Sequence, residues 1–182
     1  NLLRVAWQDI LVAVRSLRLS GWPSNIEFIA DILAGTALIL GKQRDALPLL
    51  SEAAVSRPNL LAIQVALETI ATHSHEFPLA LEANARQPET ESRTLRRVVL
   101  LHMSAKHAEC VSLFQSKGQM ASVSDPMFGF ATTLAILSAE RIVRTDLATK
   151  WESHFISDPE FAVRHALLKF WRTTNKNLLA RD

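Results

Sequence analysis

The residues of this chain that could do metal or thiol chemistry are its histidines and its single cysteine. His107 and Cys110 lie three residues apart, on one face of a helix, and His102, His73 and His75 add imidazoles. A structural zinc site needs about four converging ligands. A catalytic thiol must be accessible and activated by a base with an orienting third group. We therefore predict a packed structural thiol and no metal site.

Other catalytic and cofactor motifs are also missing from the sequence. We find no glycine-rich phosphate loop, no nucleophile elbow and no HExxH. Arg93, Arg96 and Arg97 form the densest basic cluster and could clamp a carboxylate or phosphate. Glu89, however, lies four residues before Arg93, the spacing of an ordinary helical ion pair. We favour a solvated face for these arginines and predict that the chain is not an enzyme and holds no cofactor.

The composition predicts an all-α fold to position these residues. Of 182 residues, 48% are hydrophobic, only 5 are glycine and 7 are proline, and no alternating strand pattern occurs. Helix-forming residues dominate and recur with helical period between short breaks. The breaks delimit ten helices, over about residues 3–19, 24–41, 44–56, 59–73, 77–86, 90–105, 107–117, 125–141, 145–155 and 158–174.

Several local signals set these boundaries. Ser24 with Glu27 matches a capping box, and Gly41 is a natural helix-ending glycine. Asp125-Pro126 and Asp158-Pro159 each combine an N-cap residue with a proline in the first turn. Residues 118–124 are small and polar and are predicted to form a loop.

Small and large residues recur along two successive helices. The first copy has Ala30, Leu33, Ala34 and Ala37, then Ala46, Leu50, Ala53 and Pro58. A shift of 101 residues gives Ala131, Leu134, Ala135 and Ser138, then Leu147, Trp151, His154 and Pro159. A shift of 34 fits at Leu67, Ala71 and Ala80 but not at Glu68, Asn84, Gln87 and Ser92. In the middle copy either Ala108 or Cys110 occupies the small position of the second helix.

This spacing resembles the tetratricopeptide repeat family. The resemblance implies a right-handed α-α superhelix, a solenoid of antiparallel helical hairpins, as a single domain over 1–182. Residues 1–26 would form a leading helix, 27–161 about four hairpins and 162–182 a capping helix. An irregular helical bundle is the alternative. Because the chain starts at Asn1 without a leader segment, we expect it to be part of a longer protein.

In the resembling family, ligands lie along the concave surface that the first helix of each hairpin forms. The family's lysine and asparagine clamp for carboxylates is absent, since Asp31 and Gly35 stand in its place. We therefore expect a mixed groove that suits an extended segment or an amphipathic helix. The resemblance places ten residues on it: Phe28, Asp31, Leu38, Val65, Thr69, Thr72, His73, Thr132, Ile136 and Glu140. The register of the middle hairpin decides whether Arg93 and Arg97 join them.

The sequence thus predicts a protein–protein interaction or scaffolding module, with a structural or regulatory arm of its parent chain as the alternative. A net charge of +2, from 20 basic and 18 acidic residues, argues against nucleic acid. The most apolar stretch, residues 28–40, is too short to span a membrane. The sequence does not identify the partner and is compatible with self-association. The lone cysteine slightly favours a cytoplasmic location. Apolar surface left on the last helix would dock on the rest of the parent chain.

Overall fold

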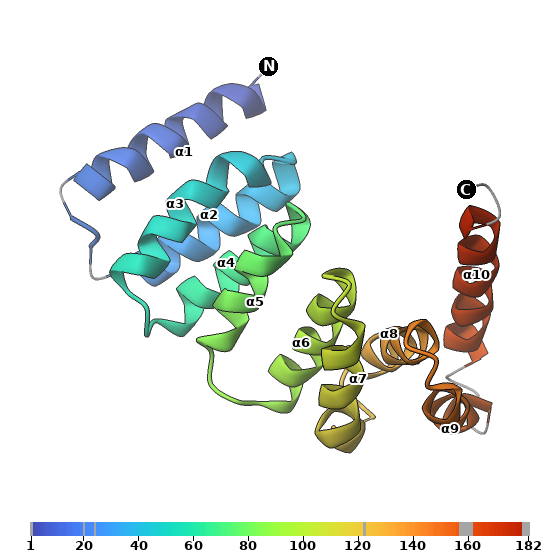
Figure 1. Ribbon diagram of the computed structural model, residues 1–182. Coiled ribbons are helices and arrows are strands. Elements are labelled where there is room, and N and C mark those ends of the chain that lie inside the picture. Colours follow the sequence, from blue (N-terminus) through green and yellow to red (C-terminus); the bar gives the residue numbers. More distant parts are fainter. Residues whose placement is uncertain (1, 20, 24, 122, 157–161, 180–182) are drawn as a thin grey trace. The chain divides into compact units, whose positions relative to one another are not determined.

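The computed structural model describes residues 2–19, 21–23, 25–121, 123–156 and 162–179 of the chain (Figure 1). Within these ranges it contains helices and turns and no strand, which confirms the all-α prediction. The helices group into two compact units, Asn1–Pro88 and Glu89–Asp182, where the sequence suggested a single domain.

The first unit is built from a leading helix and two helical hairpins. Its helices are α1 (Leu2–Leu19), α2 (Ile26–Leu40), α3 (Gln43–Ser56), α4 (Leu61–His73) and α5 (Phe77–Ala85). The pairs α2–α3 and α4–α5 form the hairpins, α4 also packs on α2 and α3, and α1 packs on α2. Trp7 of α1 is fully buried, and its indole N–H donates to Asp45 of α3 at 3.1 Å. This contact attaches the leading helix to the first hairpin.

The second unit is arranged around one central helix. It contains α6 (Glu91–Met103), α7 (His107–Ser116), a short 3-10 helix η1 (Gly118–Met120), α8 (Phe128–Arg141), α9 (Thr145–Ile156) and α10 (Ala162–Leu179). Helix α8 packs against α6, α7, α9 and α10, so its residues 131–139 are all buried. Helix α10 packs on both α8 and α9.

Each hairpin turns through the same backbone geometry. A residue with left-handed φ follows the first helix, and the next helix starts two residues later. The residue between them donates its N–H to a carbonyl five positions back, the bond of a Schellman motif. The four left-handed residues are Gly41, His75, Ala105 and Val143. The four bonds are Lys42 to Ala37 (2.7 Å), Glu76 to Ala71 (2.8 Å), Lys106 to Leu101 (2.9 Å) and Arg144 to Ala139 (2.8 Å).

The shared turn fixes the register of the second helices. Gly41 and His75 are 34 residues apart, and Gly41 and Val143 are 102 apart, one more than the sequence comparison used. Five residues after each left-handed position lies a small buried residue: Ala46, Ala80, Cys110 and Ala148. Cys110 therefore occupies the small position in the third hairpin, whereas Ala108 is exposed.

Two local predictions are corrected, and the role of Gly41 as the helix-ending glycine of α2 is confirmed. Helix α8 begins at Phe128, because the Asp125 carboxylate accepts the Met127 N–H at 2.8 Å in a tight turn that precedes the helix. The expected loop at 118–124 starts with the 3-10 helix η1. Thr90 is the N-cap of α6, and its hydroxyl accepts the Arg93 N–H. Ser24 and the Asp158-Pro159 signal lie outside the described residues.

As for a membrane span, no helix in the described ranges has both the length and the apolar character that crossing a bilayer requires.

The Val143 turn provides a direct test of this geometry. A β-branched residue at φ 61° is strained, whereas glycine adopts this conformation freely. Val143 is exposed, so its side chain contributes little packing. We expect Val143→Gly to raise the free energy of unfolding by about 1 kcal/mol, measured by urea denaturation. The converse change, Gly41→Val, should lower the free energy of unfolding by a similar amount. A change of the same sign from both substitutions would contradict the shared turn.

Candidate binding surface

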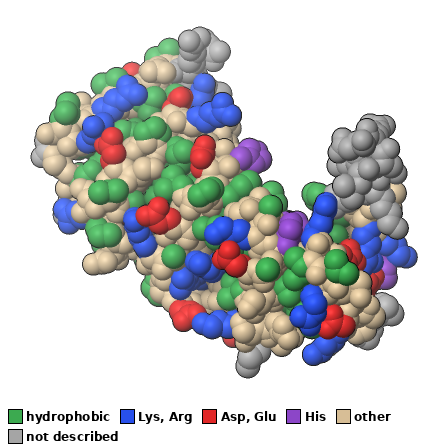
Figure 2. Space-filling model, viewed as in Figure 1, with side chains coloured by type: hydrophobic (Ala, Val, Ile, Leu, Met, Phe, Trp, Pro, Cys, Tyr) green, Lys and Arg blue, Asp and Glu red, His purple; other side chains and the backbone are tan. Residues whose placement is uncertain are grey.

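The first unit presents an apolar stripe to solvent along α2. Phe28, Ile32 and Ile39 are 64%, 44% and 85% exposed, and Gly35 lies among them at helical spacing. On the adjacent helix α4, Leu61 and Val65 are also exposed. Figure 2 shows hydrophobic side chains reaching the surface among polar atoms. Contiguous exposed apolar side chains on a folded domain mark an interaction surface.

Most of the first-unit residues predicted from the family register are accessible. Phe28, Asp31, Val65 and His73 are exposed, and Thr69 and Thr72 are half-buried. Leu38 is half-buried and packs against the core, so the neighbouring Ile39 extends the exposed stripe in its place. Ile32, Ile39 and Leu61 were missed, although their spacing from Phe28 and Val65 could have indicated them.

The polar side chains at the edge of this surface already bond to their own helix. The Thr69 and Thr72 hydroxyls donate to the carbonyls of Val65 and Glu68 at 2.8 and 2.7 Å, and His73 Nδ1 contacts the Thr69 carbonyl at 2.8 Å. Because each hydroxyl proton is already used, these threonines can accept hydrogen bonds from a partner but offer no proton. The stripe on α2 is therefore the stronger part of the surface.

The second-unit residues of the predicted groove do not form a comparable surface. Thr132 and Ile136 are buried in the packing around α8, so we withdraw both from the predicted surface. Arg93 and Arg97 are half-buried on α6, and Arg97 lines a shallow hollow of about 420 Å³ with Leu101 and Leu113.

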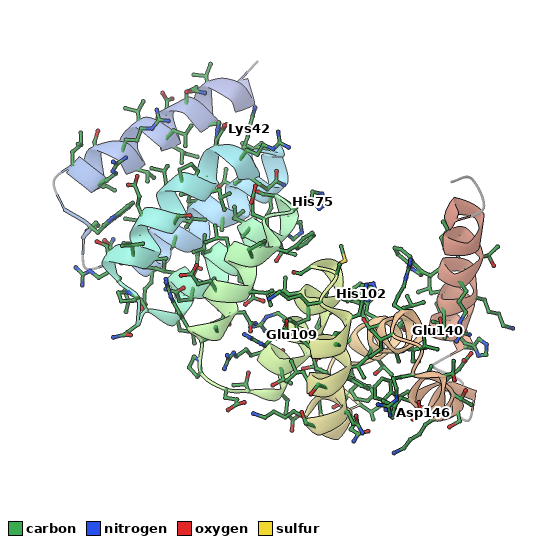
Figure 3. All side chains as sticks on the ribbon, viewed as in Figure 1. Lys42, His75, His102, Glu109, Glu140 and Asp146 are labelled. Atoms are coloured by element: carbon green, nitrogen blue, oxygen red, sulfur yellow. The ribbon has the colours of Figure 1, made fainter. Side chains whose placement is uncertain are left out.

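Glu140, labelled in Figure 3, is held by a neighbouring helix. The Arg172 guanidinium of α10 bonds to Glu140 of α8 and to Glu152 of α9 through several N–H groups, three of them at 2.8 Å. The guanidinium beside Glu152 lowers the pKa of that carboxyl. Glu140 thus fixes α10 in place and is not a free groove residue.

Three of the histidine and cysteine candidates, His102, His107 and Cys110, meet around the buried Ser138 hydroxyl, whereas His73 and His75 lie in the first unit. Nδ1 of His102 lies 2.8 Å and Nδ1 of His107 3.2 Å from the Ser138 Oγ, and the two rings are 5.3 Å apart. The Cys110 thiol is fully buried and donates to the Val98 carbonyl at 3.4 Å. Burial raises the Cys110 pKa to about 11, so the thiolate needed for nucleophilic chemistry does not form near neutral pH.

Metal coordination finds no support in the described residues, where no group of three or more His, Cys, Asp or Glu side chains is placed to hold an ion. Figure 3 shows Glu109 on α7 and His102 on α6, and neither joins such a group.

A polar hollow of about 320 Å³ lies where the turns after α2 and α4 meet. Lys42 and His75, labelled in Figure 3, line it together with Arg44 and Asp45. Since Asp45 already accepts the Trp7 indole N–H and the hollow is open to solvent, the apolar stripe on α2 remains the better-defined surface.

Comparison with known protein families, curated proteins and solved structures finds no match to this chain.

Proposed function

We propose that the chain is a protein-interaction module that binds a peptide segment or helix on the first unit. The observation that carries this proposal is the exposed stripe of Phe28, Ile32 and Ile39 on α2, continued by Leu61 and Val65 on α4. Covering these side chains would remove several large apolar groups from water, which is the main driving force of association. Asp31 at the edge of the stripe would favour a partner with a basic residue there.

The finer architecture that we propose is a solenoid of tetratricopeptide-like hairpins. The four hairpin turns support it, because they share one backbone geometry and two of their spacings are 34 and three times 34 residues. The small buried residue at a constant distance after each turn gives further support.

We propose a binding role and not a catalytic one. The protonated, buried Cys110 thiol and the Ser138 hydroxyl, which is bonded to two histidine rings inside the second unit, are both poorly placed to meet a substrate. Sites of chemistry need accessible reactive atoms beside a cleft.

The test is selection of binders from a phage-displayed library of random peptides, followed by titration of selected peptides. We expect Phe28→Ser/Ile32→Ser to weaken their binding at least about tenfold, because truncating a central apolar contact typically costs more than 1 kcal/mol. The control is Val55→Ser on α3, an apolar position outside the stripe that is even more exposed, at 75%. Peptides that bind the double variant as tightly as the original chain would overturn the proposal.

A further inference from the structure

Helix α10 is attached to its unit by its more polar side. Leu168 is fully buried, and Arg172, one turn further on, bonds to Glu140 and Glu152. The opposite side of α10 faces solvent and is apolar. Val163, Leu167 and Phe170 are 69%, 48% and 64% exposed there, and Trp171, next to the buried side, is 43% exposed. A large apolar stripe on a packed helix is unusual unless another surface covers it.

The exposed stripes of α10 and α2 have the same spacing. On α2, Phe28, Ile32, Gly35 and Ile39 follow positions i, i+4, i+7 and i+11. On α10, the exposed Val163, Leu167 and Phe170 follow the first three of these positions, and half-buried Thr174 occupies the fourth. Each stripe therefore forms one line of side chains along its helix, the pattern with which two helices pack lengthwise.

The charges of the two helices are complementary. Helix α2 contains Glu27 and Asp31 and no basic residue, whereas α10 contains Arg, Lys and His residues and no acidic one. Glu27 and Asp31 flank the α2 stripe on one side, and exposed Lys169 flanks the α10 stripe on the corresponding side. These edges meet when the two helices run antiparallel. Two α10 helices, or two α2 helices, would instead bring like charges together.

Gly35 gives the α2 stripe a notch at its centre. Glycine inside a helix costs about 1 kcal/mol relative to alanine, and a Cβ at this position would meet nothing within 4 Å, so packing inside the unit does not require it. A missing side chain allows a large residue of a second helix to approach the backbone closely. Phe170 on the α10 stripe is a side chain of suitable size.

We propose that this chain associates with itself, the apolar face of α10 in one copy lying antiparallel on the α2 stripe of a second copy. The inference rests on the proposed function, since it takes the α2 surface as a docking site and names its occupant. The two contact surfaces differ, so the association is head-to-tail and continues into rings or chains.

Sedimentation velocity on the full chain tests this over a range of concentrations and salt. Mass should rise with concentration and fall with added salt, because the edge contacts are exposed ion pairs. The acidic edge is reversed in one variant, Glu27→Lys/Asp31→Lys. The basic edge is made acidic in another, Lys169→Glu/Thr173→Glu, since exposed Thr173 lies one helical turn after Lys169 on the same edge. Each alone should weaken association at least about tenfold.

The deciding measurement mixes the two variants. In the mixture each reversed edge meets its complement on the other variant, so association should return. A contact made within one chain cannot produce this recovery. A chain that stays monomeric at all concentrations, or variants that fold by circular dichroism but do not associate when mixed, would overturn the proposal.

The same variants and the selected peptides distinguish a failure of this inference from a failure of the proposed function. Lys169→Glu/Thr173→Glu leaves α2 unchanged and should bind the selected peptides normally. Peptide binding by a strictly monomeric chain overturns self-association and leaves the proposed function in place. If the chain associates with itself but no peptide binds to α2, the proposed peptide-binding function is contradicted and the self-association is supported.

Discussion

Replacing Phe114 with alanine is expected to lower the free energy of unfolding of the second unit by about 3–5 kcal/mol. Phe114 of α7 is 1% exposed, and its ring meets the Trp151 ring of α9 edge-on at 4.9 Å. It also lies 6.5 Å from the Phe128 ring of α8. One side chain thus joins three helices, and its removal leaves a cavity that rigid neighbours cannot fill. Urea denaturation, monitored by circular dichroism, measures the change.

The matched control for this substitution is Phe130→Ala on α8. Phe130 is about half exposed, so the same chemical change removes much less packing and should cost about 1 kcal/mol or less. Equal costs for the two phenylalanines would contradict the central position of Phe114.

Gly118 offers an independent check on the Phe114 site. A Cβ at this buried glycine would lie 2.5 Å from Cδ2 of the Phe114 ring, so Gly118→Ala forces the ring to move and should cost about 1–3 kcal/mol. In the Phe114→Ala background the obstacle is gone, and the cost of Gly118→Ala should largely disappear. A double-mutant cycle measures this coupling, and additive effects would show that the ring does not rest on Gly118.

The positions of the helices could be predicted because their limits depend on local chemistry. Gly41 ends α2 in the left-handed conformation expected of it, and Thr90 caps α6 with its own hydroxyl. Where the expected signal failed, another local contact replaced it: the Asp125 carboxylate bonds to Met127 and closes a turn before α8. His75, Ala105 and Val143 also end helices with positive φ, although none is a residue type that announces this conformation.

The polar residues that broke the repeat pattern could not be interpreted from the sequence. Glu68, Asn84 and Gln87 occupy positions where the pattern expects small or apolar residues, and all three are buried. In the structure Asn84 and Gln87 both donate side-chain N–H groups to the Glu68 carboxylate. Three exceptions thus compensate one another across α4 and α5. Their partners are 16 and 19 residues away, beyond the reach of helical periodicity.

The second-unit part of the predicted surface failed for a related reason. Periodicity identifies which residues share a helix face, but not which neighbouring helices cover that face. Helix α8 is enclosed by four other helices, so Thr132 and Ile136 are buried although they keep their expected helical positions. On α10, by contrast, apolar side chains are left exposed, which agrees with the expectation of leftover apolar surface on the last helix.

The cluster around Ser138 is expected to make the second unit sensitive to acid. The pKa of His102 is lowered to about 4, mainly by burial and further by His107 and Arg141. Burial, and then the charge of Arg141, also lower the pKa of His107. Folding therefore favours the neutral rings. Stability should be complete above about pH 6.5, the ordinary value for histidine, and should decrease as the pH falls towards 4.

The hydrogen bonds explain why protonation disrupts the cluster. His102 bonds to the Leu134 carbonyl as well as to Ser138. A neutral ring has a single N–H. If that proton goes to Leu134, Nδ1 of His102 accepts the Ser138 O–H, and His107 must donate its own Nδ1–H to the Ser138 oxygen. A proton added at Nδ1 of His102 makes this nitrogen a donor that faces the Ser138 O–H, so the hydrogen bond between them is lost. It also adds a positive charge that His107 and Arg141 disfavour.

We expect the free energy of unfolding to fall by about 2 kcal/mol between pH 6.5 and pH 4.5. The full shift of the His102 pKa would correspond to about 3 kcal/mol of stability, and we expect less because the ring keeps some contact with solvent. Urea denaturation at several pH values measures the slope. His102→Gln keeps a donor and an acceptor but does not titrate, so its profile should be flatter. Ion-paired carboxylates such as Asp146 do not titrate in the upper part of this pH range, because Arg144 lowers the pKa of Asp146 to about 2. An unchanged slope in His102→Gln would assign the acid sensitivity to other groups.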